Sequence, residues 1–121
     1  MSRLKRALVY TRDACRLQGA PASPDQLNAC RAYAREQGMI VVGHYNDFGS
    51  GLVIRQGLQS LWADLRAGKA DAVITRDAAR LSRSAADLYE LLEEAASLGV
   101  TVHTVKGEIG LECLDPKGGS R

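Results

Sequence analysis

The sequence predicts an α/β fold of three layers, in which a mainly parallel sheet of four to five strands is flanked by helices. Three observations favour this fold. Apolar strand segments alternate with amphipathic helix segments along the chain. The connections between them are short, which implies right-handed crossovers. The apolar residues of Ala70 to Thr75 are nearly continuous, which is typical of a parallel strand covered on both faces.

The chain is expected to begin with a strand and a helix. Arg6 to Tyr10 is a short β-rich run, and a polar loop is expected from Thr11 to Ala22. Ser23, Pro24 and Gln26 then mark a helix start, because proline suits the first helical position and the Gln26 side chain can reach back to Ser23. The apolar stripe of this helix consists of Leu27, Cys30, Tyr33 and Ala34.

A second strand and a second helix follow. Gly38 is well placed to end the first helix, and Met39 to Tyr45 is expected to be a strand. Asn46 to Gly51 is expected to be a turn. A further apolar stripe predicts a helix that Gly68 closes, and its members are Leu58, Leu61, Trp62 and Leu65.

The rest of the chain repeats this alternation. After the strand Ala70 to Thr75, Ser84 is expected to cap a third helix that Gly99 ends. The buried face of that helix consists of Leu88, Leu91, Leu92 and Ala95. Val100 to Val105 predicts a fourth strand. We therefore expect one domain over residues 1–109 and a tail over residues 110–121, with Leu111 to Leu114 as a candidate edge strand.

Composition limits the classes of function. The chain has 121 residues, of which 45% are hydrophobic and 25% charged, as expected for one soluble globular domain. The net charge of +2 does not by itself indicate a nucleic-acid-binding protein. No apolar run is long enough to span a membrane, so we expect a cytoplasmic protein without a membrane partner.

Metal sites and disulfides are not indicated. Cys15, Cys30 and Cys113 have neither the number nor the spacing of a disulfide framework or a zinc site, so reduced thiols are expected. His44 and His103 have no partner at ligand spacing, and each is expected to be a strand residue. We predict no metal and no other cofactor.

Polar residues gather where the predicted strands end, which is where ligands bind in parallel sheets. Four segments stand at such places: Tyr10 to Arg12, Asp47 to Gly51, Arg55 to Leu58, and Arg80 to Ser84. Their order and spacing resemble the catalytic domain of serine recombinases, the resolvase/invertase family, over roughly residues 6 to 109. The resemblance implies that the α/β fold is resolvase-like.

Each segment matches part of the family pattern. Tyr-x-Arg-x-Ser is matched by Tyr10 and Arg12, and the family's next glutamine by Gln26. Asp-x-Gly-x-Ser-Gly is matched in part by Asp47 to Gly51, which is one residue shorter, and the arginine that follows is matched by Arg55. These matches are individually weak.

The family hallmark, Asp-Arg-Leu-Ser-Arg, is more specific, and Arg80 to Arg83 match its last four residues. The resemblance implies that Ser82 is not the nucleophile of the reaction. Its expected role is to hydrogen-bond the turn that orients Arg80 and Arg83.

The resemblance implies DNA strand exchange in site-specific recombination. In the family, a serine hydroxyl attacks a DNA phosphodiester, a phosphoserine forms and a deoxyribose hydroxyl leaves. Guanidinium groups can neutralise the developing charge without a metal, because arginine is always charged and binds phosphate with a planar fork. The resemblance assigns Arg12, Arg80 and Arg83 to a DNA-phosphate-binding cage with Arg55 nearby. It assigns to Asp47 the ordering of the pocket or the handling of a proton.

Other arginines are expected to be ordinary solvated charges. These are Arg16, Arg31, Arg35, Arg66 and Arg76.

Two positions depart from the family pattern. Counting from Tyr10 and Arg12, the nucleophile position is Ala14, and the acid before Arg80 is replaced by Ala79. A methyl group cannot attack phosphorus, so we expect no normal strand cleavage.

Cys15 is an alternative nucleophile, because a thiolate is reactive and nearby arginines lower a thiol pKa. Against it, one step along an extended chain turns the side chain to the opposite side. We therefore favour an impaired catalytic domain over an active variant that uses Cys15.

The resemblance also implies partners. DNA is expected to bind weakly through its phosphates, with strong salt dependence. A homo-oligomer or a full-length serine recombinase is the candidate protein partner. The family's long dimer helix has no matching pattern in Gly110 to Arg121, so we expect weak dimerisation and weak site recognition. An interaction protein that modulates a full-length recombinase and a decayed fragment without a role remain as alternatives.

Overall fold

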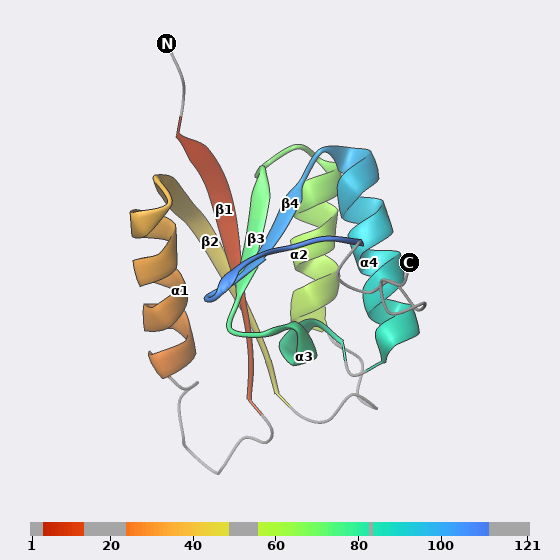
Figure 1. Cartoon of the computed structure of the whole chain (residues 1–121), viewed down its shortest axis with the longest axis horizontal. Helices are drawn as coiled ribbons and strands as arrows, with labels where there is room; N and C mark the ends of the chain where they lie inside the picture. The colour runs from red at the N-terminus through yellow and green to blue at the C-terminus, as the bar shows by residue number, and fades with distance from the viewer. Residues whose placement is uncertain (1–3, 14–23, 49–55, 83, 112–121) are drawn as a thin grey trace, which may run out of the picture.

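The computed structural model describes residues 4–13, 24–48, 56–82 and 84–111. Within these ranges, five strands form one sheet in the order β2-β1-β3-β4-β5. β1 to β4 are parallel, and β5 is antiparallel to β4. Helix α1 covers one face of the sheet, and α2 and α4 cover the other (Figure 1). The predicted three-layer α/β fold is confirmed.

The strands β1 (Lys5–Asp13) and β2 (Met39–Phe48) are both longer than predicted. They pair in parallel to their ends, where Arg12 lies opposite Asp47. Residues 11–13 and 46–48, which were expected in loops, therefore belong to the sheet, because each strand supplies the other's hydrogen-bond partners. The pairing contains one bulge at Val42, which lies between two residues that have partners on β1.

The strands β3 (Ala72–Thr75) and β4 (Thr101–Thr104) complete the parallel part of the sheet. All four residues of β3 are buried, as expected for a strand covered on both faces. The strand β5 (Gly107–Ile109) was not predicted, since we expected the edge strand at Leu111 to Leu114. A tight turn after β4 brings Gly107–Ile109 back antiparallel to β4, and these residues pair with it. Leu111 follows the strand, and residues 112–114 lie outside the described residues.

Three of the helices, α1 (Pro24–Glu36), α2 (Gln56–Arg66) and α4 (Ala85–Leu98), occur where they were predicted. The Ser84 hydroxyl accepts a hydrogen bond from the Asp87 backbone N–H at 3.3 Å and so caps α4. Gly99 ends α4 with a φ of 73°, a left-handed conformation that favours glycine. The short helix α3 (Ala78–Leu81) replaces part of the loop expected between β3 and α4.

The core has two clusters, one on each face of the sheet. The larger lies under α2 and α4 and is built mainly of leucines with Trp62 and Tyr10. The smaller lies under α1, and its buried members are Ala7, Val9, Cys30, Tyr33, Ala34, Ala72 and Ile74. None of the helices in the described part of the chain is long and apolar enough to cross a membrane.

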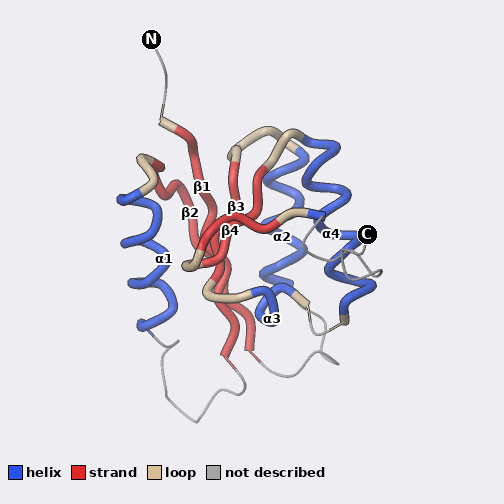
Figure 2. Tube along the Cα trace, in the orientation of Figure 1, coloured by secondary structure: helices blue, strands red, loops and turns tan. Residues whose placement is uncertain are grey.

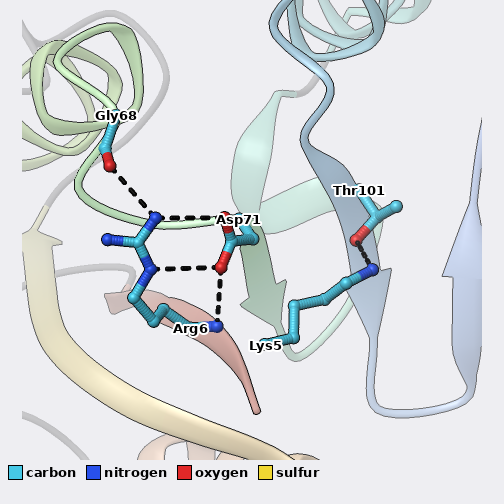
Figure 3. A network of polar contacts seen from close by, with 5 residues as sticks. All are labelled: Lys5, Arg6, Gly68, Asp71 and Thr101. Carbon is cyan, nitrogen blue, oxygen red and sulfur yellow. Dashed lines mark hydrogen bonds and ion pairs between the residues drawn. The ribbon is translucent and has the colours of Figure 1, made fainter. Parts of the chain in front are cut away.

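A charged pair fastens the beginning of the sheet. Arg6 donates from Nε and Nη2 to the two carboxylate oxygens of Asp71, each at 3.1 Å, and its backbone N–H also donates to Asp71 at 2.9 Å (Figure 3). Arg6 also donates to the Gly68 carbonyl at 3.1 Å. The pair therefore joins the start of β1 to the turn before β3, at the end of the sheet opposite the residues considered next.

Candidate functional site

The carboxyl ends of β1 and β2 meet the segment that follows β3 at the edge of the sheet where the parallel strands end (Figure 1). Arg12 and Asp47 are direct neighbours across the first two strands. Thr75, the last residue of β3, lies opposite Tyr10, and α3 follows after two residues. The structure thus brings together the ends of three of the segments that the sequence placed at a common site.

The Arg12 guanidinium lies against α3. Its Nε donates to the Arg80 carbonyl at 3.2 Å, and its Nη2 donates to the Ala79 carbonyl at 2.8 Å. The Arg12 residue is only 7% exposed. The last carbonyls of a helix lack partners within the helix, and a cation near them is favourable. Arg12 therefore satisfies these carbonyls and fixes the Arg80 backbone beside β1.

Gln26 holds the backbone of the same arginine. Its Oε1 accepts from the Arg12 N–H at 3.1 Å, and its Nε2 donates to the Arg12 carbonyl at 3.0 Å and to Asp13 Oδ1 at 3.2 Å. The pairing of β1 with β3 ends at Tyr10, so the Gln26 amide supplies partners that β3 does not. The buried Gln26 amide is thus engaged with β1, and Ser23, to which this side chain was expected to return, lies outside the described residues.

Asp47 connects β1, β2 and α2. One carboxylate oxygen accepts from the Tyr10 hydroxyl at 2.8 Å and from the Leu58 N–H at 3.0 Å, and the other accepts from the Gly57 N–H at 2.7 Å. The carboxylate therefore caps the first turn of α2, where both its hydrogen bonds and its negative charge are favourable. This contact supports an ordering role for Asp47.

Gly57 permits this close approach. A Cβ atom at position 57 would lie 2.9 Å from Asp47 Oδ1 and 3.0 Å from the Asn46 carbonyl oxygen. Real Cβ contacts are essentially never shorter than 3.0 Å. The first turn of α2 can therefore sit on the end of β2 only because residue 57 has no side chain.

The hallmark segment has an internally bonded turn. Asp77 caps α3 by accepting from the Arg80 N–H at 3.2 Å. The Ser82 hydroxyl donates to the Ser84 carbonyl and accepts from the Ser84 N–H, both at 3.1 Å. Ser82 therefore shapes the connection between α3 and α4, which agrees with its expected role beside Arg80.

Several predicted site residues lie outside the described residues. These are Ala14, Cys15, Arg55 and Arg83, as well as residues 49–51 of the Asp47 segment. The described residues that the structure gathers at the edge are Tyr10, Arg12, Gln26, Asp47, Arg80 and Ser82.

The sequence did not single out a polar group beside this edge. The buried Thr11 hydroxyl contacts His44 Nε2 at 2.8 Å and also bonds Asn46. Burial, and then the charge of Arg31, lower the pKa of His44. The only sequence signal for this group was the alternation of side chains between the two faces of the sheet along β1. That alternation turns Thr11 to the α1 face and Arg12 to the other face. Both histidines lie in strands, as predicted.

Metal ligands do not cluster in the described part of the chain, where no three His, Cys, Asp or Glu residues are arranged to hold an ion. Arg66, which was expected to be a solvated charge, pairs with Glu94 at 2.5 Å on the surface. Arg31, Arg35 and Arg76 are exposed.

Comparison with known proteins gives a consistent result. The sequence matches the resolvase N-terminal domain over residues 7–119. The N-terminal catalytic domain of TP901-1 integrase has a similar structure, with a TM-score of 0.74 and 26% identity over 84% of this chain and 79% of that chain. No curated protein matches the sequence.

Two further structures are similar. The C-terminal catalytic domain of ISC1926 TnpA, an IS607-like serine recombinase, has a TM-score of 0.74 and 28% identity over 83% of this chain and 70% of that chain. A resolvase family site-specific recombinase from Streptococcus pneumoniae has a TM-score of 0.77 over 96% of this chain and 87% of that chain. Its identity of 24% supports the similarity of fold alone.

Proposed function

The chain belongs to the resolvase family of serine recombinases, and we propose that it is a catalytic-domain-like protein that binds DNA phosphates but no longer cuts DNA. In this proposal, residues 1–109 form the catalytic-type domain, and residues 110–121 form a tail. Arg12, Arg80 and Arg83 contribute the phosphate-binding guanidiniums, with Arg55 nearby.

One observation carries the phosphate-binding part of the proposal. The Arg12 side chain is hydrogen-bonded to the backbone carbonyls of Ala79 and Arg80, which holds the Arg80 backbone beside the Arg12 guanidinium. This contact anchors the backbone from which the Arg80 side chain extends, and groups held in place before a charged ligand arrives are more effective than mobile ones, because little reorganisation is needed. Arginine also remains charged at any relevant pH and matches the geometry of a phosphate.

The loss of cleavage rests on position 14. The family's reaction needs a hydroxyl there, and this chain has Ala14, whose methyl group cannot attack phosphorus. In an unrelated hydrolase, removal of the nucleophile lowers the rate by about 10⁶. Ala79 stands where the family has an acid, which points in the same direction.

DNA binding can be tested by fluorescence anisotropy with a short duplex at about 50 and 200 mM salt. We expect weak binding that falls steeply with salt. Arg80→Gln should weaken binding and lower the salt slope by about 1. Arg35→Gln is the matched control, because it removes the same charge from the exposed side of α1. Equal losses in the two variants would contradict a phosphate site at Arg80.

Cleavage can be tested with supercoiled plasmid. We expect the unmodified chain to give no covalent protein-DNA adduct. An adduct would contradict the proposal, and its loss in Cys15→Ala would identify Cys15 as the nucleophile. Ala14→Ser combined with Ala79→Asp tests the pocket itself, since recovered cleavage would show that the remaining groups are still correctly placed.

A further inference from the structure

Helix α1 is the only described helix on its face of the sheet, whereas α2 and α4 pack side by side on the other face (Figure 2). Its buried cluster includes three alanines and Cys30, while the opposite cluster is built mainly of leucines with a tryptophan. Hydrophobic stabilisation grows with the apolar area removed from water. The packing of α1 on the sheet therefore depends more strongly on polar contacts than the packing of α2 and α4 does.

Two of these polar contacts are buried. The Tyr33 hydroxyl lies 2.8 Å from His103 Nδ1 on β4, and the two rings are 5.5 Å apart at their centroids. Two turns earlier, the Gln26 amide binds the backbone of Arg12. One face of α1 thus contacts both a titratable ring and the arginine of the candidate site.

The surroundings of His103 disfavour a positive charge. The residue is 6% exposed, and its Nε2 lies 2.9 Å from the Thr101 hydroxyl, which also accepts from Lys5 Nζ at 3.4 Å (Figure 3 shows this second bond). Burial lowers the pKa of His103 and Lys5 lowers it further, while Glu108, opposite His103 on β5, acts in the other direction.

Protonation would change the contact with α1. In the neutral ring, Nδ1 can accept the Tyr33 proton while Nε2–H donates to Thr101. Once protonated, Nδ1 becomes a donor, so the tyrosine hydroxyl has to turn its own proton away. The ring then also carries a buried charge, which is costly. A state in which α1 has lifted and the ring is hydrated binds the proton more readily.

We propose that protonation of His103 releases α1 from the sheet and, through Gln26, loosens the hold on the Arg12 backbone. The device is a property of the fold, and its test requires no DNA. If α1 is not released at low pH, the proposed DNA binding is therefore unaffected. If the chain does not bind DNA, the proposed release of α1 is likewise unaffected.

Amide hydrogen exchange measures this release directly, because the Arg12 N–H donates to Gln26. The chain is compared at about pH 7.5 and about pH 5.5, with rates corrected for intrinsic exchange. We expect opening at Arg12 and along α1 to increase by up to about tenfold per pH unit, the limit for one proton. At each pH, the amides of α4 should open far less often than those of α1 and Arg12, because they exchange only when the whole domain unfolds. Opening of α4 as frequent as that of α1 at both pH values would mean global unfolding and would overturn the proposal.

Substitutions assign the effect to one ring. His103→Asn keeps an acceptor for Tyr33 but cannot titrate, so the pH dependence at Arg12 should disappear. His44→Asn is the matched control, because the hydrogen-bond partner of His44 is Thr11 of β1 and not a residue of α1. The nearby charge on α1, Arg31, is exposed and therefore screened by solvent, so it couples His44 only weakly to the position of α1. It should leave most of the pH dependence in place. A His103→Asn variant with unchanged pH dependence would overturn the proposal.

The unmodified chain provides a second measurement that does not depend on a variant folding. The proton resonance of the His103 ring gives the pH at which the folded residue titrates. The rise in Arg12 exchange should level off at that pH, since both states are protonated below it. A rise that continues well below it would exclude His103 as the controlling group.

Discussion

The Tyr10 hydroxyl donates a 2.8 Å hydrogen bond to the Asp47 carboxylate, which also accepts two N–H groups of α2. Tyr10 is fully buried, and Asp47 is nearly so. The end of one strand therefore fixes the start of a helix through a side chain of the neighbouring strand. The interaction should contribute both to stability and to the geometry of the sheet edge that carries Arg12.

Tyr10→Phe should destabilise the protein. The substitution removes a hydrogen bond to a buried carboxylate, and such bonds contribute about 1.5–3 kcal/mol. Urea unfolding should show a lower midpoint with an unchanged slope. Tyr89→Phe, on the exposed side of α4, is the control and should have little effect. Equal stability of the two variants would mean that the Tyr10 contact contributes nothing.

Gly57→Ala should also destabilise, although alanine is favoured over glycine inside a helix by about 1 kcal/mol. The new methyl group would approach Asp47 and the Asn46 carbonyl too closely, so the first turn of α2 would have to move. Thermal unfolding can show whether the substitution lowers or raises the stability of the protein. A higher midpoint for the alanine variant would show that α2 moves away without loss of the Asp47 contacts.

Cys30 should resist alkylation in the folded protein. The thiol is completely buried, and burial raises its pKa to about 12, so the reactive thiolate is scarce near neutral pH. Peptide mapping after treatment with iodoacetamide should find Cys30 unmodified in buffer and modified in denaturant. Rapid labelling in buffer would show that α1 opens readily even at neutral pH.

Global stability should fall as the solution is made mildly acidic. Burial lowers the folded-state pKa of both His44 and His103 below the ordinary value of 6.5. Above that value, both states are neutral and the folded state has its full stability. Below it, the unfolded state binds protons first, so stability decreases until the folded histidines also titrate. Urea unfolding from about pH 7.5 to 5.5 should show the decrease, and it should shrink in His103→Asn.

The three longer helices, α1, α2 and α4, could be predicted from sequence because their signals are local. Ser84 and Gly99 mark the ends of α4 through contacts with residues a few positions away. Strand ends could not be predicted in the same way. β1 continues to Asp13 because β2 runs beside it and Gln26 binds Arg12, and neither partner is close in sequence. β5 was missed for the same reason, since its three residues form a strand only by pairing with β4.

The candidate site was predicted in part. Motif spacing placed Arg12 and Arg80 together, and the structure brings them into contact. Motif spacing cannot show that the Arg12 side chain is directed at backbone carbonyls, because that depends on where α3 folds. The roles of Ala14, Arg55 and Arg83 stay predictions, since these residues lie outside the described ranges.

The strand order has a consequence for self-association. It leaves the ten-residue strand β2 at an edge of the sheet, with Ile40 and Val42 each 48% exposed. Such an edge can recruit a strand from another molecule. The bulge at Val42 breaks the even spacing of N–H and C=O groups, so an incoming strand cannot pair along the whole edge. This irregularity should keep concentrated solutions of the protein free of edge-to-edge aggregates, and deletion of Val42 should remove that protection.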